Sequence, residues 1–202
     1  MAGQAANERK RYAPDERRQM IVDEAAAFFS EVGLEGTTRE LSQRLGVTQS
    51  LLYAYFASKA DLLEAVFERV YLDRLSPDWP VLIADRSLPV RERAQRFYRE
   101  YTGAIFTYEW MRIFMFSGLA GTELNRRYLA HLAKLMLEPL CTEMRHAAGG
   151  REGPQMEDIW NLHGGIVYIG IRKFVYCVPT PDDFGPPVEA AVDRFCDSFG
   201  LG

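Results

Sequence analysis

The sequence contains few of the residues that build disulfides, metal sites and nucleophilic active sites. Among its 202 residues are three cysteines and three histidines. The cysteines, Cys141, Cys177 and Cys196, lie far apart and form no CxxC pair, so we expect reduced thiols and no metal ion. None of the histidines stands in a metal-binding or nucleophile motif such as HExxH or GxSxG. We therefore expect no catalytic residues, no cofactor and no enzymatic activity.

Long apolar runs and strand patterns are also missing. Glu109 and Arg112 interrupt the most aromatic segment, and a charge at mid-bilayer costs roughly 2.5–3.5 kcal/mol on insertion scales, so a membrane span is a poor interpretation. No charged segment followed by an apolar run opens the chain, so we expect no secretory signal. Together with the unpaired cysteines, this favours a cytoplasmic protein. The sequence shows no sustained strand alternation and no internal repeat, and its helical periodicities predict an all-α fold.

Basic residues are fewer than acidic ones, 24 against 28. The net charge is −4, so the chain as a whole does not attract nucleic acid. Any binding to DNA must therefore depend on local charge. Three cations and one acid between residues 37 and 59 give that segment a net charge of +2. Arg9, Lys10 and Arg11 add positive charge to residues 1–12, which we expect to form a flexible basic arm.

Helix signals follow one another in the first third of the chain. Pro14 can open a first helix, and Gly33 is placed to end it. Thr37 and Glu40 have the spacing of a capping box, so a second helix begins there. Gly46 ends that helix, most simply in the left-handed conformation that glycine adopts at little cost.

Two more helices are expected after this glycine. Thr48 can cap a third helix, with Leu52 and Phe56 on its inner side, and Ser58 can cap a fourth. Two short helices that are joined by a glycine turn and packed on a longer first helix form a helix-turn-helix. We therefore predict a three-helix DNA-binding domain over residues 13–75, with the fourth helix as its connector.

The outer side of the third helix carries polar residues that suit DNA. Gln49, Ser50 and Tyr53 fall opposite its buried side, and such a helix can enter the major groove N-terminus first. Glutamine pairs with adenine edges, and Lys59, in the first turn of the fourth helix, suits a phosphate. The residues expected to contact double-stranded DNA are Thr37, Thr38, Arg39, Thr48, Gln49, Ser50, Tyr53, Tyr55 and Lys59. The alternative is a solvated helical hairpin with an ordinary polar surface.

The segment from Asp15 to Val70 resembles the N-terminal domain of the tetracycline-repressor (TetR) family. The matching positions are Phe28–Phe29, Gly33, Thr37–Thr38, Gly46–Val47, Leu52–Tyr53, Phe56, and Lys59 with Leu62–Leu63. The stretch TTRELSQRLGVTQSLLY is especially close to the family pattern. The resemblance covers about a quarter of the chain. It implies a transcription regulator that binds DNA through this domain.

The resemblance also implies roles for single residues. Arg39 and Gln49 correspond to base contacts in the family. Thr38, Tyr53 and Lys59 correspond to phosphate contacts. The third helix departs from the family pattern at several positions, and these departures leave the operator sequence open.

The remainder of the chain, residues 76–202, is rich in aromatic side chains. Nine of the 32 residues from 97 to 128 are aromatic, which is 28% against 12% for the whole chain. Aromatic and methionine side chains with few polar atoms suit a pocket for an apolar or aromatic molecule, and family members commonly hold an inducer in this domain. The candidate ligand-binding residues are Phe97, Tyr101, Tyr108, Trp110, Met111, Phe114, Trp160, His163 and Arg172. The alternative is a packed helical core.

The last two long helices are candidates for a dimer interface. The first of them contains Gly164, Gly165 and Gly170, and an interior glycine costs about 1 kcal/mol relative to alanine. That cost suggests a compensating close approach by a second helix or by a ligand. Family members pair through their last two long helices, which implies a homodimer. The candidate interface residues are Ile159, Ile166, Val188, Val192, Phe195 and Phe199.

Two functions fit these features. The first is a ligand-responsive regulator, a repressor that an apolar or aromatic small molecule with one acidic or hydrogen-bonding group releases from a palindromic operator. The second is a constitutive dimeric DNA-binding protein without inducer. The excess of aromatic residues favours the first. An enzyme on a helical scaffold is a weaker alternative, which would need an open cleft with paired titratable groups.

Overall fold

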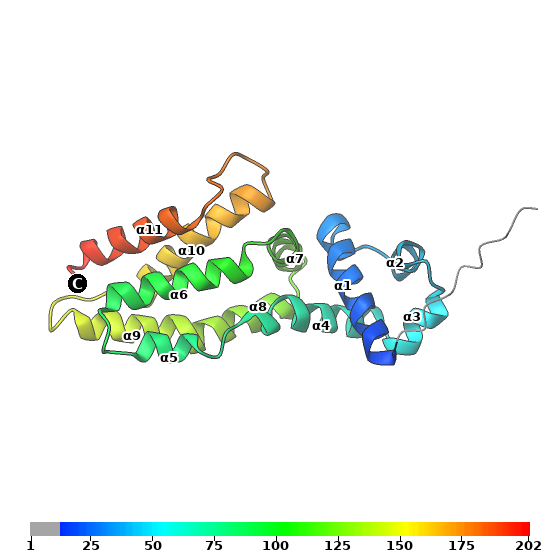
Figure 1. Ribbon diagram of the computed structural model, residues 1–202, viewed down its shortest axis with the longest axis horizontal. Helices are drawn as coiled ribbons and strands as arrows, with labels where there is room; N and C mark the ends of the chain where they lie inside the picture. Colours follow the sequence, from blue (N-terminus) through cyan, green and yellow to red (C-terminus); the bar gives the residue numbers. More distant parts are fainter. Residues whose placement is uncertain (1–12) are drawn as a thin grey trace, which may run out of the picture.

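Helices dominate the part of the protein that the structure describes. The computed structural model describes residues 13–202, and this range contains α-helices, one 3₁₀ turn and one π-helical segment but no strand. The all-α fold expected from the sequence is therefore confirmed. The molecule is elongated, with α1 to α3 at one end and α5, α6 and α8 to α11 in the larger body (Figure 1). The basic arm expected around Lys10 lies outside the described residues.

The N-terminal helices begin and end where the capping signals predict. They are α1 (Pro14–Val32), α2 (Thr38–Leu45), α3 (Gln49–Tyr55) and α4 (Lys59–Val70). The hydroxyl of Thr37 accepts a hydrogen bond from the Glu40 amide at 3.2 Å, while the Glu40 carboxylate accepts one from the Thr37 amide at 2.8 Å. Gly46 adopts the left-handed conformation, with φ of 66°. Because both ends of α2 are fixed by local bonds, the turn to α3 is set by the sequence itself.

The C-terminal helices depart from the sequence prediction at three places. They are α5 (Trp79–Ala84), α6 (Val90–Ile105), α7 (Tyr108–Leu119), α8 (Glu123–Leu132), α9 (Glu138–Ala147), α10 (Met156–Phe174) and α11 (Gly185–Ser198). The stretch SPDWP (Ser76–Pro80) predicts a linker after the fourth helix, but a short helix, α5, begins within it. The apolar pattern from Pro89 predicts a helix that runs on past Ile105, but Thr107 caps a new helix, α7. Pro139 has no N–H and predicts a kink or break, and the structure has a π-helical segment, Ala133–Leu137, just before it.

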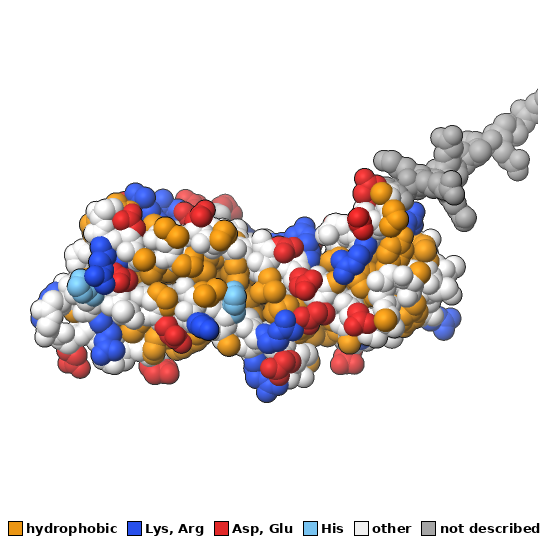
Figure 2. All heavy atoms as spheres, turned by 90° about the horizontal axis from the view of Figure 1, so that it is seen from below, with side chains coloured by type: hydrophobic (Ala, Val, Ile, Leu, Met, Phe, Trp, Pro, Cys, Tyr) orange, Lys and Arg blue, Asp and Glu red, His pale blue; other side chains and the backbone are white. Residues whose placement is uncertain are grey.

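The face of the described residues drawn in Figure 2 carries no field of a single charge. Acidic and basic side chains are interspersed along the whole face drawn in Figure 2, as the small net charge suggests. None of the described helices is long and apolar enough to cross a membrane. Binding to a polyanion must therefore depend on the placement of a few cations.

One ion pair lies inside the larger body, where α6 packs against α9. An Nη atom of Arg93 donates to the Glu143 carboxylate at 3.0 Å and to the Ile83 carbonyl oxygen at 2.5 Å. The side chains are 4% and 11% exposed. The pKa of Glu143 is lowered from 4.5 to about 2, because Arg86 and Arg93 donate hydrogen bonds to its carboxylate. The pair fixes the position of α9 relative to α6.

The N-terminal helices meet the rest of the protein where α7 packs on α1. Nε of Arg112 donates to the Ser30 carbonyl oxygen, at the C-terminus of α1, at 2.6 Å. Its guanidinium lies over the rings of Tyr108 and Phe116, at 5.0 and 5.2 Å from their centroids. A cation at a helix C-terminus is favourable, and the rings on either side hold it in place. Arg112 therefore joins the N-terminal helices to the larger body.

We expect Arg112→Met to lower the free energy of unfolding by about 1.5–3 kcal/mol, the range for hydrogen bonds to charged groups. Urea unfolding of the full chain measures this difference. A matched control is Arg126→Met, because Arg126 forms an exposed ion pair with Glu123 on the same helix. That change should cost less than about 1 kcal/mol. Equal costs for the two variants would contradict the role assigned to Arg112.

Candidate nucleic-acid interface and aromatic core

The residues predicted to contact DNA gather at the end of the molecule where α3 lies (Figure 1). Both helix N-termini, with Thr37, Arg39, Thr48, Gln49 and Ser50, are exposed there. Tyr53 is also exposed, while Tyr55 and Lys59 are half-buried and Thr38 is buried. The polar side of α3 is therefore available to a partner, whereas Leu52 is fully buried against the other helices.

Thr38 connects the residues of the two helices. Its hydroxyl lies 3.0 Å from the Tyr53 hydroxyl and accepts a hydrogen bond from Nε2 of Gln49 at 3.3 Å. The resemblance implied a phosphate contact for Thr38, but here its side chain is buried between α2 and α3. Its bonds orient Gln49 and Tyr53 before any DNA is bound, which reduces the entropy that binding must overcome.

Lys59 is already bonded within the protein. Its Nζ donates to the Leu34 carbonyl oxygen at 2.6 Å and lies 5.8 Å from the centroid of the Phe29 ring. An ammonium group has three donors, so this bond leaves two for a phosphate. The bond also holds the N-terminus of α4 against the turn that follows α1. Lys59 thus combines a structural role with the position expected of a phosphate contact.

The local positive charge is smaller than the sequence indicated. Arg44 lies within 2.5 Å of both Glu24 and Glu31 on α1, so two carboxylates neutralise it. Arg39 is exposed and forms no ion pair with a described residue. Of the three cations between residues 37 and 59, Arg39 and Lys59 are therefore the two left available to DNA, and the net charge of +2 counted for that segment overstates the charge that a duplex would meet there.

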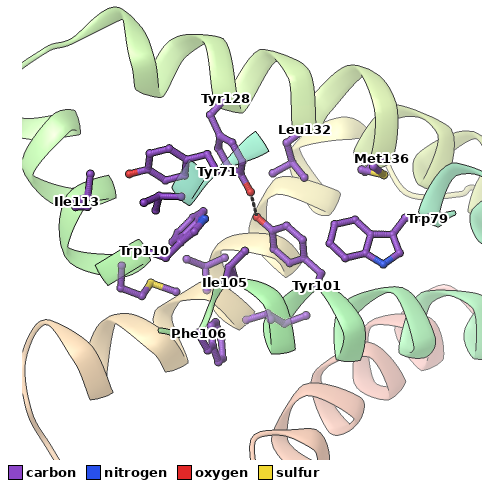
Figure 3. Packing of buried hydrophobic residues seen from close by; sticks show 14 of the residues in the cluster. Tyr71, Trp79, Tyr101, Ile105, Phe106, Trp110, Ile113, Tyr128, Leu132 and Met136 are labelled. Carbon is purple, nitrogen blue, oxygen red and sulfur yellow. Dashed lines mark hydrogen bonds between the residues drawn. The ribbon is translucent and has the colours of Figure 1, made fainter. Parts of the chain in front are cut away.

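The aromatic residues of the larger body form a packed core rather than a hollow. Phe97, Tyr101, Trp110 and Met111 are at most 1% exposed. The rings of Trp110 and Phe114 stack at 5.0 Å, and the hydroxyls of Tyr101 and Tyr128 form a hydrogen bond of 2.8 Å (Figure 3). These side chains are covered by the core, so no solvent-open pocket lies at them, and their role in ligand binding stays a prediction. An open hollow of about 550 Å³ lies elsewhere, between α6 and the loop before α11.

Some of the candidate ligand residues lie at the edge of this core. Tyr108 is exposed and lies beneath the Arg112 guanidinium, so it belongs to the contact with α1. Trp160 and Arg172 are half-buried. His163 is buried, and its ring lies 5.4 Å from that of Tyr101 and 5.8 Å from that of Trp160. Burial lowers the pKa of His163 to about 4, so the ring is neutral at neutral pH.

Tyr71 is a core residue that the sequence did not single out. It follows α4, is 1% exposed, and its ring packs on Trp110 at 5.3 Å and on Tyr128 at 5.4 Å (Figure 3). The signal was present, because Tyr71 follows Val70 at the end of the apolar stripe of the fourth helix. Through Tyr71, α4 extends from the helix-turn-helix into the aromatic core.

Four of the six candidate dimer residues are covered by the protomer itself. Ile159, Ile166, Val188 and Val192 are fully buried within the chain, so they cannot contact a partner. They face inward because α10 and α11 each pack their larger apolar side on the protomer's own helices. Phe195 and Phe199 are half-buried and pack on each other at 5.1 Å, which leaves part of both rings at the surface.

The outward side of α10 is formed by other residues. A Cβ atom placed on Gly164 or Gly165 would have no neighbour within 4 Å, and Tyr168 on the next turn is 50% exposed. Gly170 differs, because its missing side chain leaves room for Met111 and Phe106, which approach within 2.4 and 2.8 Å of the Cβ position. The close approach expected at the glycines therefore occurs within the chain only at Gly170.

Comparison with known sequences places the helix-turn-helix. The sequence model described as bacterial regulatory proteins, tetR family, matches residues 21–66, from α1 into α4. The class C tetracycline repressor protein of Escherichia coli is 43% identical over 53 residues, which are 26% of this chain and 24% of that protein. The chain thus matches about a quarter of the length of this curated relative.

Comparison with solved structures extends the likeness to the larger body. A TetR-like transcriptional regulator from Rhodococcus sp. RHA1 superposes with a TM-score of 0.65 at 18% identity, over 91% of this chain and 97% of that chain. A TetR family transcriptional regulator from Pseudomonas syringae pv. tomato str. DC3000 gives 0.62 at 18% identity, over 92% and 97%. At such identities the likeness shows a shared fold.

Proposed function

We propose that this protein is a dimeric, ligand-responsive transcription regulator, since its helix-turn-helix belongs to the tetR family of bacterial regulatory proteins and the whole chain has the fold of TetR-like regulators. The class C tetracycline repressor and the structural neighbour from Pseudomonas syringae are named as a repressor and a transcriptional regulator, in agreement with the expectation that the chain is not an enzyme. The observation that carries the proposal is the exposed polar side of α3, which Thr38 holds in order at the end of the molecule.

The proposal divides the chain between two tasks. Residues 13–75 bind an operator through α2 and α3, and α4 connects them to the larger body. Residues 76–202 bind the small molecule and pair two protomers through the outward sides of α10 and α11. In the dimer the two α3 helices would face successive major grooves, whose spacing is roughly 34–36 Å. A palindromic operator follows from the two-fold symmetry.

The contacts of α7 and α4 suggest how a ligand would act on DNA binding. α7 places Trp110 in the aromatic core and Arg112 on α1, while α4 carries Lys59 at one end and is followed by Tyr71 at the other. A ligand that opens the core must displace these helices, and with them the helix-turn-helix. It shifts the equilibrium only by its differential affinity for the two forms, and a tenfold preference corresponds to about 1.4 kcal/mol.

Two single substitutions test the assignment of the DNA-binding surface. Gln49→Ala should relax the preference at one base pair of a selected duplex, with roughly 1–3 kcal/mol at stake. Lys59→Ala should weaken selected and random duplexes about equally and lower the salt slope by about 1, because a phosphate contact carries no sequence information. Fluorescence anisotropy at several salt concentrations gives both quantities. If both variants bind both duplexes as the wild type does, the assignment is wrong.

The packed core favours a second candidate, a constitutive DNA-binding dimer. Trp110 and Tyr101 are buried among packed rings, so the binding of a ligand beside them would require the core to open. Mass spectrometry of the protein as purified, together with a thermal-shift screen, separates the two candidates. A co-purified or stabilising small molecule that lowers operator affinity supports the ligand-responsive regulator, whereas unchanged operator affinity in every compound supports the constitutive one.

A further inference from the structure

Four polar atoms in the aromatic core have no hydrogen-bond partner among the described residues. The Tyr71 hydroxyl is one of them, and the others are the Tyr98 hydroxyl, the indole nitrogen of Trp110 and Nδ1 of His163. Tyr98 is fully buried, Trp110 is 1% exposed and His163 is 6% exposed. Native proteins pair the great majority of such groups, so an unpaired one requires an explanation. The atoms of Tyr98, Trp110 and His163 come from three helices, α6, α7 and α10.

The three residues belong to one set of rings. The His163 ring lies 6.0 Å from that of Tyr98 and 5.4 Å from that of Tyr101. The Tyr101 hydroxyl is bonded to that of Tyr128, whose ring lies 5.5 Å from that of Trp110. We call Tyr98, Tyr101, Trp110, Tyr128 and His163 the aromatic cage. Figure 3 shows Tyr101 and Tyr128 joined by their hydrogen bond, with Trp110 beside them.

The chemistry of the cage restricts what could satisfy these atoms. The indole N–H of Trp110 is a donor only, so it requires an acceptor on the bound molecule. The Tyr98 hydroxyl can donate or accept a hydrogen bond. Nδ1 of neutral His163 either donates or accepts one, depending on which ring nitrogen carries the proton. All five cage residues are neutral at neutral pH. The tyrosines and the tryptophan carry no charge, and burial lowers the pKa of His163 to about 4. A ligand charge would therefore meet no opposite charge within the cage itself, which is unfavourable for a buried charge.

From this arrangement we infer that the effector is a neutral, mainly aromatic molecule with at least two polar groups. One group accepts a hydrogen bond from Trp110, and another bonds the Tyr98 hydroxyl or Nδ1 of His163. The inference rests on the proposed ligand-responsive function and names the chemical class of its ligand. It replaces the acidic group that the sequence left open with uncharged hydrogen-bonding groups.

In the absence of ligand, the Tyr98 hydroxyl should contribute nothing to the stability of the protein. Tyr98→Phe removes an unpartnered atom, so the melting temperature should stay the same or rise. Tyr101→Phe is the matched control, because Tyr101 is equally buried on the same helix. That change breaks the 2.8 Å bond and leaves Tyr128 unpaired, so it should lower the melting temperature by roughly 2–6 °C. A loss for Tyr98→Phe as large as that for Tyr101→Phe would contradict the inference.

Matched probes test the ligand class on the protein with residues 1–202. We expect 2,6-dihydroxynaphthalene to raise the melting temperature more than naphthalene does, and naphthalene-2,6-dicarboxylate to have no effect. Tyr98→Phe should lower the affinity for the dihydroxy probe at least tenfold and leave the affinity for naphthalene unchanged. Calorimetry measures both affinities. Preferential binding of the dicarboxylate, or equal binding of the dihydroxy probe to wild type and Tyr98→Phe, would overturn the inference and leave the proposed function intact. A further outcome is that no compound in a library of neutral and charged compounds raises the melting temperature of the protein while operator binding persists. That result would contradict the ligand-responsive function itself, and the inference with it.

Discussion

Replacing Glu143 by alanine is expected to lower the free energy of unfolding by about 3–5 kcal/mol, the cost of removing one member of a buried ion pair. The carboxylate lies 3.0 Å from an Nη atom of Arg93, whose side chain is only 4% exposed. Without Glu143 the guanidinium would keep its bond to the Ile83 carbonyl oxygen but would lose the ion-pair partner that it has among the described residues. Urea unfolding of the full chain measures the loss.

Two further variants separate the buried pair from its exposed neighbour. Arg86 also bonds Glu143, but its side chain is 56% exposed, so Arg86→Ala should cost less than about 1 kcal/mol. A double variant, Arg93→Met with Glu143→Leu, should recover much of the stability, because apolar residues can replace a buried pair. If Arg86→Ala cost as much as Glu143→Ala, the buried pair would not be the source of the effect.

The same pair gives stability a defined pH dependence. Because the pKa of Glu143 is lowered to about 2 in the folded protein, its contribution is complete above pH 4.5 and is lost as the pH falls toward 2. The difference in stability between wild type and Glu143→Gln should therefore shrink as the pH falls below 4.5. A difference that stays constant between pH 7 and pH 3 would contradict this assignment.

Gly165→Gln is expected to convert the proposed dimer to a monomer and to weaken operator binding by roughly 10²–10⁴, the gain that linking two binding modules provides. Within the protomer the added Cβ atom has no neighbour within 4 Å, and a glycine in a helix interior is less favourable than glutamine. The protomer should therefore keep or gain stability. At a close helix–helix contact, however, the added side chain would hold the partner away. Light scattering and anisotropy measure the two effects.

Gly103→Gln is the matched control for this change. Gly103 is also an exposed glycine inside a helix, α6, and a Cβ atom there would likewise meet nothing within 4 Å. This variant should remain dimeric and bind operator as the wild type does. A dimeric Gly165→Gln protein with normal operator affinity would show that the outward side of α10 is not the interface.

The local order of the N-terminal helices could be predicted from single residues, because each signal acts over three or four positions. Thr37 and Thr48 cap α2 and α3, and Gly46 ends α2 in the left-handed conformation. The break between α6 and α7 could not be predicted, because the apolar periodicity of the sequence continues across it. Thr107 is an equally good cap, but nothing in its neighbourhood required a helix to start there.

The candidate site was harder to predict, because burial and pairing are decided by distant parts of the chain. The sequence could not show that Arg44 is neutralised by Glu24 and Glu31, which precede it by 20 and 13 residues. It indicated which helices carry the aromatic core, but not that the rings would close on one another. It also could not tell which side of α10 is left outward, since Ile166 and Gly165 are neighbours with opposite exposure.

Selection of bound duplexes from a random pool tests the central claim most directly. The full chain, as a dimer at physiological salt, should enrich a palindromic site whose half-sites lie one helical turn apart, about 10–10.5 base pairs, or a multiple of this spacing. Gln49→Ala should enrich the same site with relaxed preference at one base pair in each half. Recovery of no sequence above the starting pool, by a folded and dimeric protein, would contradict the account that α3 reads an operator.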